Sequence, residues 1–266
     1  MPWSLLDILS ALPVYALVLF RLTGLMLTAP LFASSVIPVR IRVALTVTVA
    51  AMIFPLVAPS APTNVTLLMV AVGGVAELMI GATIGLALAV LFLGTEVGGM
   101  LVGQQGGLAL GQVFDPTQNR QTTVVAQIYT IVWTLIFLII GGHRATMAAL
   151  LDTYEVIPLL TFRFDESYML MLVEMLTAAF VMAIRLAGPV LIALFMLGTA
   201  MGFLSRTMPQ FNILTIGFAL RGMVAIGVAG FALIACEDLF VDAIWNGLEL
   251  VRASFGLDGA VGGGTS

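Results

Sequence analysis

The chain is a series of long apolar segments separated by short polar breaks. Windows of 18 residues or more that contain no Asp, Glu, Lys or Arg include 22–39, 43–76, 97–114, 121–143 and 186–205. A helix needs about 20 mostly apolar residues to cross the hydrocarbon core of a bilayer. The pattern therefore predicts an all-α, polytopic membrane protein built of long helices and helical hairpins.

The breaks between apolar segments give the expected helix boundaries. We expect helices over 5–28, 40–54, 124–140, 168–205 and 213–245, with a short segment over 145–154 and a turn at Pro158. Proline ends or kinks a helix at the residue before it, so Pro30 and Pro38 bracket a turn and Pro55 closes the second helix. The apolar stretch from residue 65 almost to 114 is either one very long helix or two in series. The last two helices form a hairpin with its tip at 206–212.

One segment does not fit a lipid-facing helix. Residues 98–123 are rich in Gly and Gln and contain Asp115-Pro116. Irregular polar backbone at membrane depth is tolerated only where it is buried in protein or lines a water-filled space. This segment therefore indicates a channel, a gate or a buried assembly contact.

Composition narrows the class of function. The chain is 61% hydrophobic and 9% charged, with a mean hydropathy of +1.16, well outside the range of soluble domains. All ten basic residues are Arg, which excludes phosphate-loop and Schiff-base lysines. One His and one Cys cannot form a His/Cys zinc cluster, and a net charge of −4 argues against nucleic-acid binding. We expect neither an enzyme nor a cofactor.

Charged residues within the apolar segments are expected to be buried. Arg costs about 2.5–3.5 kcal/mol at the centre of a membrane helix on insertion scales, so it usually faces protein or water. One interpretation is an ion or proton pathway. The other, which we favour, is pairing across helix interfaces or a position outside the lipid. The residues concerned are Arg21, Glu77, Glu96 and Arg185.

Glycines recur at a spacing of four residues, which places them on one helix face. Small residues at this spacing let membrane helices approach closely. We expect helix packing within the chain, and contacts with other subunits, at the pairs Gly81/Gly85, Gly94/Gly98 and Gly198/Gly202.

Several motifs occur in a characteristic order along about 240 residues. They are Phe20-Arg21 with Pro30 and Pro38-x-Arg40, Glu77-Leu78-Met79-Ile80-Gly81 with Gly85, Gly107-Leu108 leading to Phe114-Asp115-Pro116, Gly142-His143, Pro158, Met208-Pro209-Gln210 with Ile216-Gly217-Phe218, and Cys236-Glu237 before Leu239-Phe240. In this order they resemble the FliR family, export-gate subunits of the bacterial flagellar type III secretion system. The SctT-type proteins of injectisomes are similar.

This resemblance implies a non-enzymatic subunit of a protein-export gate. It implies a location in the bacterial inner membrane at the flagellar basal body, with parts raised out of the bilayer plane. FliP and FliQ would form the pore with it, FlhB would lie on the cytoplasmic side, and unfolded flagellar substrates would pass through. The fold implied is a FliP-like half over 1–167, a FliQ-like hairpin over 168–256 and a flexible tail over 257–266.

The resemblance also implies the site residues. The segment 103–121 would be a loop that plugs the pore, with Gly103, Gln104, Gln105, Gly106, Gly107, Phe114, Asp115 and Pro116. The hairpin tip would carry Arg206, Pro209 and Gln210. Ala219 stands where relatives often carry Pro, which predicts a straighter second hairpin helix.

Other classes of protein stay open at this point. An injectisome gate subunit is the nearest alternative. A secondary transporter would show broken helices in both halves, whereas only one broken segment is visible. An intramembrane enzyme would depend on Ser205, His143 or Cys236.

Overall fold

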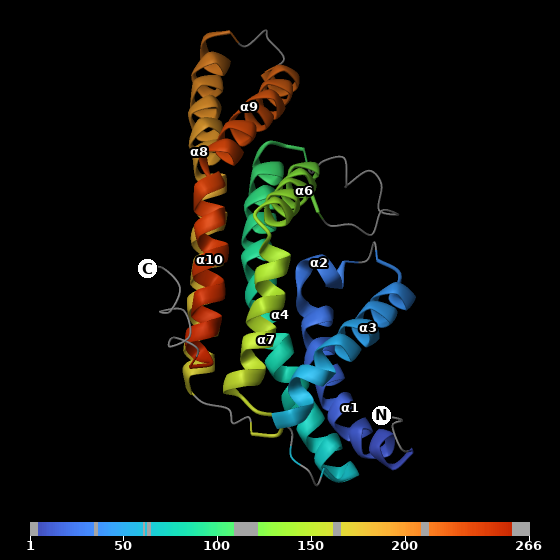
Figure 1. The fold of residues 1–266 in the computed structure, drawn as a ribbon. Helices are drawn as coiled ribbons and strands as arrows, with labels where there is room; N and C mark the ends of the chain where they lie inside the picture. The colour runs from blue at the N-terminus through green and yellow to red at the C-terminus, as the bar shows by residue number, and fades with distance from the viewer. Residues whose placement is uncertain are drawn as a thin grey trace. The chain divides into compact units, whose positions relative to one another are not determined.

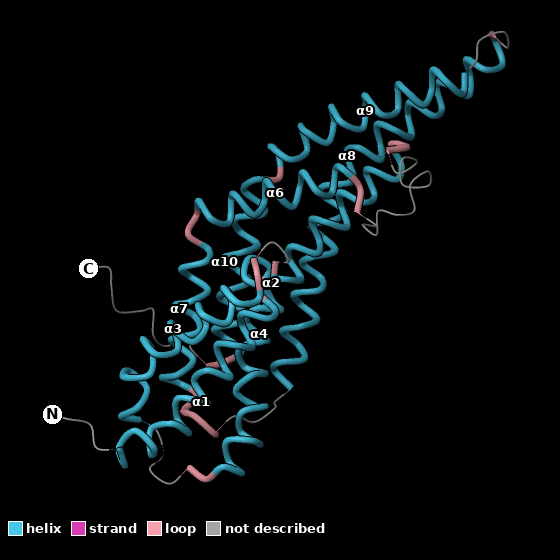
Figure 2. Tube along the Cα trace, turned by 90° about the vertical axis from the view of Figure 1, so that its right-hand side faces the viewer, coloured by secondary structure: helices cyan, strands magenta, loops and turns pink. Residues whose placement is uncertain are grey.

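Every regular element in the described residues is a helix, as Figure 2 shows. The structure is a computed structural model that describes residues 5–34, 37–60, 62, 65–108, 122–161, 166–208 and 213–256. The elements in chain order are α1 (Leu5–Thr28), α2 (Pro30–Ala33), α3 (Val39–Val57), the 3₁₀ turn η1 (Ala58–Ser60), α4 (Leu67–Gln105), α6 (Val124–Ile139), α7 (Gly142–Val156), α8 (Glu166–Thr207), α9 (Ile213–Ala235) and α10 (Glu237–Ser254). The prediction of an all-α protein is confirmed.

Within the described residues, five helices are long and apolar enough to cross a membrane. They are α1, α3, α4, α8 and α9, and the count rises to six if α6 and α7 form one bent span. Gly141 permits the bend because its φ is +75°, a left-handed conformation that costs most other residues about 1–2 kcal/mol. The chain has the helices of a polytopic membrane protein.

Several helix ends differ from the expected bounds by a few residues, and two of these differences have a clear physical reason. Helix α3 continues through Pro55 to Val57, because Pro so close to a helix end removes only one backbone hydrogen bond. The predicted helix over 213–245 is interrupted at Cys236, and α10 begins at Glu237. Glu237 and Asp238 lie in the first turn of α10, where acidic side chains stabilise the positive end of the helix dipole. The stretch from residue 67 forms a single helix of 39 residues.

The chain divides into two compact units that are interleaved along the sequence. The first comprises residues 1–89, 141–175 and 244–266, and the second comprises 90–140 and 176–243. Helices α4, α8 and α10 therefore each contribute residues to both units. These units are not the expected FliP-like and FliQ-like parts. The expected boundary between those parts, at 167/168, stays a prediction.

In the first unit, α1 packs against α3 and against the first part of α4. Figure 1 shows α3 beside α1, and Tyr15 meets Phe54 edge to face there. Glycine sets the close approach of α1 to α4. A Cβ at Gly24 would clash with the backbone of Leu78 and Ala82, and one at Gly81 would clash with the Arg21 carbonyl. The two backbones therefore lie in direct contact around Arg21.

In the second unit, the end of α4 packs against α6 and α8. A Cβ at Gly94 would clash with the backbone of Ala179, and one at Gly98 would lie 3.1 Å from the Ala183 carbonyl oxygen. Aromatic rings from α4, α6 and α10 form a cluster, made of Phe92, Trp133, Phe137 and Phe240. The last part of α8 and α9 lie side by side as a hairpin in Figures 1 and 2.

Candidate functional site

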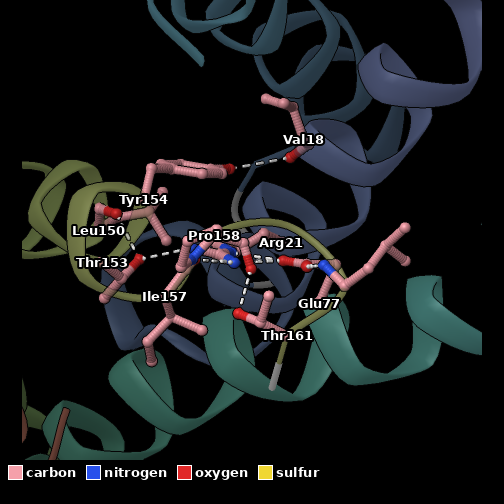
Figure 3. A network of polar contacts seen from close by, with 10 residues as sticks. Val18, Arg21, Glu77, Leu150, Thr153, Tyr154, Ile157, Pro158 and Thr161 are labelled. Carbon is pink, nitrogen blue, oxygen red and sulfur yellow. Dashed lines mark hydrogen bonds and ion pairs between the residues drawn. The ribbon is translucent and has the colours of Figure 1, made fainter. Parts of the chain in front are cut away.

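A buried ion pair occupies the core of the first unit. Arg21 Nε and Nη2 both lie 2.6 Å from Glu77 Oε2, and neither side chain is exposed to solvent. Arg21 Nη1 donates to Thr153 Oγ1 (3.1 Å), and Nη2 donates to the Ile157 carbonyl (3.1 Å). Figure 3 shows these contacts converging from α1, α4, α7 and the turn after α7. The pair therefore joins three helices at one point.

The surroundings of the ion pair hold it in one geometry. The Tyr154 ring lies 4.2 Å from the Arg21 guanidinium carbon, and its hydroxyl donates to the Val18 carbonyl (3.3 Å). Glu77 Oε1 accepts a hydrogen bond from the backbone N–H of Leu160 (3.0 Å). Leu160 has a φ of +69°, which costs a non-glycine residue about 1–2 kcal/mol. The carboxylate thus stabilises an otherwise unfavourable turn.

These contacts are those of a structural ion pair. Each of the three Arg21 nitrogens has a partner, each Glu77 oxygen accepts a hydrogen bond, and the two side chains are out of contact with water. Proton transfer needs a route to water or to a further titratable group. The geometry favours the pairing interpretation of Arg21 and Glu77 over the pathway.

The other two charges expected to be buried are placed differently. In the chain by itself, Arg185 is exposed and Glu96 is half-buried. Helix α8 packs against α4 through Ala183 and Leu186, and a residue between these two positions projects to another side of the helix. The expectation of burial therefore fails for Arg185 within this chain and holds only in part for Glu96.

Helix α4 ends at the start of the Gly/Gln segment, in a Schellman motif. The Gly107 N–H donates to the Gln104 carbonyl (3.2 Å), and the Leu108 N–H donates to the Gly103 carbonyl (2.9 Å). Gly107 has the required left-handed conformation, with φ +75°. Residues 103–107, expected to belong to the loop, are thus the last helical turn and its cap. The Gln104 and Gln105 side chains are exposed.

The Gly/Gln segment leaves α4 and rejoins the described chain beside the same helix. Thr123 caps the N-terminus of α6 by accepting a hydrogen bond from the Ala126 N–H (3.3 Å), and its hydroxyl donates to the Gly99 carbonyl (3.1 Å). A Cβ at Gly103 would clash with the Thr123 side chain. Both described ends are therefore fixed on α4. Phe114, Asp115 and Pro116 lie outside the described residues.

The hairpin places its predicted residues near its end. Arg206 lies in the last turn of α8 and is exposed, whereas Pro209 and Gln210 lie outside the described residues. The Gly198 and Gly202 pair differs from the pairs on α4. A Cβ at Gly198 would lie 3.5 Å from Arg221 Nη2, and one at Gly202 would have no described atom within 4 Å. Among the described residues, none lies close to the Gly202 position.

Sequence reasoning missed several residues on which the site depends. Thr123 stands directly before an apolar run, which is a recognisable N-cap signal. Gly24 has no partner glycine four residues away, so the spacing rule did not predict its contact with α4. Pro158 predicts the turn that holds Leu160, but the contact of the Leu160 N–H with Glu77 and the role of Thr153 carry no sequence signal, because only tertiary contacts explain them. In the described part of the chain, no cluster of three His, Cys, Asp or Glu side chains could hold a metal ion.

Comparison with known proteins identifies the family. The sequence model described as "Bacterial export proteins, family 1" matches residues 12–246. The flagellar biosynthetic protein FliR of Pectobacterium carotovorum subsp. carotovorum is 32% identical over 80% of this chain and 81% of its own length. FliR of Escherichia coli strain K12 is 31% identical over 87% of this chain and 90% of its own. The secretion system apparatus protein SsaT of Salmonella typhimurium is 24% identical over 56% of this chain and 58% of its own. The resemblance found in the sequence motifs is confirmed, and the chain belongs to family 1 of the bacterial export proteins, the family of FliR.

Proposed function

We propose that this chain is a membrane subunit of the flagellar type III protein-export gate. In this role it forms, with FliP and FliQ, the pore through which unfolded flagellar proteins cross the inner membrane, and FlhB binds on the cytoplasmic side. The observation that carries the proposal is the family match over residues 12–246, together with relatives named flagellar biosynthetic protein over most of their length. The role requires no catalytic residue of this chain.

The exposed apolar surface of the hairpin supports a role inside a larger assembly. Only 17% of the apolar window Thr215–Ala235 in α9 is buried within the chain, against 56% for the window in α4. Aromatic side chains on α8 and α9 face outward, as at Phe203 and Phe231. Membrane helices associate by van der Waals packing where small residues allow a close approach, and α9 carries Gly217, Gly222, Gly227 and Gly230 among its apolar residues. We assign the hairpin 168–256 to contacts with neighbouring subunits, as a FliQ-like part.

The polar segment after α4 is the proposed plug of the pore. Residues 103–107 form the last turn and cap of α4, and Thr123 is hydrogen-bonded to the same helix. We propose that these contacts anchor the two ends of a plug over residues 103–121. Glycine and glutamine suit a plug because they allow the backbone to bend and keep it hydrogen-bonded.

Export function is tested by deleting the gene from its host. The deletion should abolish swimming and the release of flagellin into the medium, and a plasmid copy should restore both. A host that stays motile and flagellated after the deletion would refute the flagellar assignment. Loss of effector secretion with unchanged motility would instead favour the injectisome alternative, for which SsaT is the relevant relative.

The plug is tested separately by replacing residues 109–120 with a short Gly-Ser linker. Because the α4 cap and Thr123 remain, the gate should still assemble and co-purify with FliP and FliQ. The membrane should then leak small ions, measured as current across a planar bilayer containing the purified complex. A matched control replaces the same residues with a scrambled sequence of equal length. Unchanged ion permeability in the assembled linker variant would exclude the plug.

A further inference from the structure

A cavity of ≈ 480 Å³ lies in the second unit, where the end of α4 meets the hairpin. It is lined by Gln105 of α4, by Leu191, Leu194, Phe195 and Thr199 of α8, and by Arg221 of α9. Its volume is within the range of small-molecule pockets, about 300–1,000 Å³. The walls are apolar on the α8 side and polar at Gln105 and Arg221.

Arg221 is a cation inside an apolar helix that lacks a partner among the described residues. It lies within the apolar window Thr215–Ala235, and its guanidinium crosses α8 at Gly198, where a Cβ would lie 3.5 Å from Nη2. The two ion pairs of the described chain involve other arginines. Arg in a membrane segment almost always pairs or reaches water. The counter-ion of Arg221 must therefore come from outside the described residues.

The polar groups around the cavity suit an oxyanion with attached hydroxyls. The Gln105 amide is a second donor on the cavity wall. The Thr199 hydroxyl donates to the Phe195 carbonyl (3.0 Å), so its oxygen presents an acceptor. None of the described lining residues is acidic. Phosphate oxygens match Arg and an amide donor, and a headgroup hydroxyl matches the free acceptor of Thr199.

We propose that this cavity binds the headgroup of an anionic phospholipid. Three observations favour a lipid over a carboxylate from another protein. The cavity is much larger than one carboxylate, Gln105 is the last residue of its apolar helix, and large apolar side chains of α8 lie exposed beside the cavity, with Ile192 65%, Phe195 76% and Met196 68% exposed. Basic pockets between membrane helices bind anionic headgroups, with the acyl chains on the apolar surface nearby. The inference needs only a membrane location and does not depend on the export role.

Lipid retention on the purified protein tests this site. The chain, co-expressed with its partner subunits where it requires them, is purified in neutral detergent and incubated with phosphatidylglycerol or with phosphatidylcholine of the same acyl chains. Native mass spectrometry then measures bound lipid. The wild type should retain phosphatidylglycerol, and Arg221→Leu should weaken its binding about 10- to 100-fold, since a hydrogen bond to a charged group contributes about 1.5–3 kcal/mol. Retention of phosphatidylcholine should not change.

Three matched variants make the result specific. Arg185→Leu removes an exposed arginine from α8 outside the cavity and should leave phosphatidylglycerol binding unchanged. Arg221→Lys should restore part of the binding. Gly198→Leu keeps Arg221 but fills the space beneath its guanidinium, so it should lower the binding as Arg221→Leu does. Because Arg221 is exposed, its variants should elute as folded protein.

Several results would overturn the proposal. If Arg185→Leu and Arg221→Leu lower phosphatidylglycerol binding equally, the anionic lipid is attracted by the positive charge of the protein in general and does not bind at this cavity. Saturable binding of inorganic phosphate that displaces the lipid would identify a small-anion site. Release of a co-purified subunit by Arg221→Leu, with phosphatidylglycerol retained, would identify a protein carboxylate as the partner.

Discussion

The buried pair of Arg21 and Glu77 predicts that the effect of Arg21→Leu on stability depends on whether Glu77 is charged. Removing one partner of a buried ion pair strands the other charge and costs about 3–5 kcal/mol, whereas removing both can be nearly neutral. Arg21→Leu should therefore strongly destabilise the wild-type chain. In a Glu77→Gln background, the same change should be neutral or stabilising.

The structure sets the size of each step. Glu77→Gln keeps an oxygen that can accept from the Leu160 N–H but removes the charge that faces Arg21 at 2.6 Å. We expect a loss of about 3–5 kcal/mol, because a guanidinium with no exposed surface is left without a counter-ion. Adding Arg21→Leu removes that stranded charge and leaves the Ile157 carbonyl without its donor, at about 1–3 kcal/mol, while the NH2 group introduced by Glu77→Gln lacks an acceptor both before and after the change. Thr153 keeps its own bond to Leu150 (2.6 Å). The second change should therefore recover up to about 4 kcal/mol.

Thermal unfolding in detergent, followed by fluorescence-detected size exclusion, measures the four proteins of this cycle. For a chain of this size, about 1 kcal/mol corresponds to roughly 2–4 °C. Each single variant should lose about 6–20 °C, and the double variant should melt above Glu77→Gln or level with it. If Arg21→Leu lowers Tm equally in both backgrounds, the two side chains act independently and the stranded-charge argument is wrong.

Three further predictions concern the close helix contacts, the α4 cap and the single thiol. Gly81→Ala should lower stability by about 1–3 kcal/mol in the same melting assay, because the new Cβ clashes with the Arg21 carbonyl, whereas Gly202→Ala, at a position that no other described residue approaches closely, should be neutral or slightly stabilising. Gly107→Ala should cost about 1–2 kcal/mol at its φ of +75° and speed hydrogen exchange in the last turn of α4. If residues 102–108 exchange at the wild-type rate, the Schellman motif does not stabilise that end. Burial raises the pKa of the Cys236 thiol despite the opposing charge of Arg185, so less thiolate exists at neutral pH and maleimide labelling should be slower than for a free cysteine until the pH is raised. Rapid labelling at pH 7 would contradict this.

The sequence predicted most helices because apolar length alone determines them. The first helix, 5–28, has the bounds found for α1, and the long helix from residue 67 was one of two open possibilities. Boundaries failed where local rules competed with tertiary context. Pro55 ends a helix by the general rule, yet one missing hydrogen bond near the end of α3 is tolerated. The break at Cys236 was missed because no Gly or Pro marks it.

The site was harder to predict than the helices because its partners are distant in sequence. Arg21 and Glu77 stood out as charges in apolar segments, but Thr153 and Ile157 are joined to Arg21 across more than 130 residues. A single chain gives no sequence signal for such contacts. Arg185 was expected to be buried, but in the chain by itself it is exposed. Hydropathy treats a helix as one environment, whereas the direction of the side chain on α8 decides whether it meets protein.

Two of the arginines in the apolar helices have no counter-charge among the described residues of this chain. Arg21 is neutralised within the fold, while Arg185 and Arg221 are exposed on helices long and apolar enough to span a membrane. On insertion scales, two such arginines facing lipid would cost about 5–7 kcal/mol together, which is comparable with the whole stability of a typical domain, about 5–15 kcal/mol. The native surroundings must therefore supply counter-charges or water at both positions. In the proposed export assembly, neighbouring subunits or a wet pore would provide both for Arg185, and in the proposed lipid site an anionic headgroup would provide the counter-charge for Arg221. The distribution of unpaired arginines is thus a physical reason, independent of family membership, to place this chain in an assembly within a membrane.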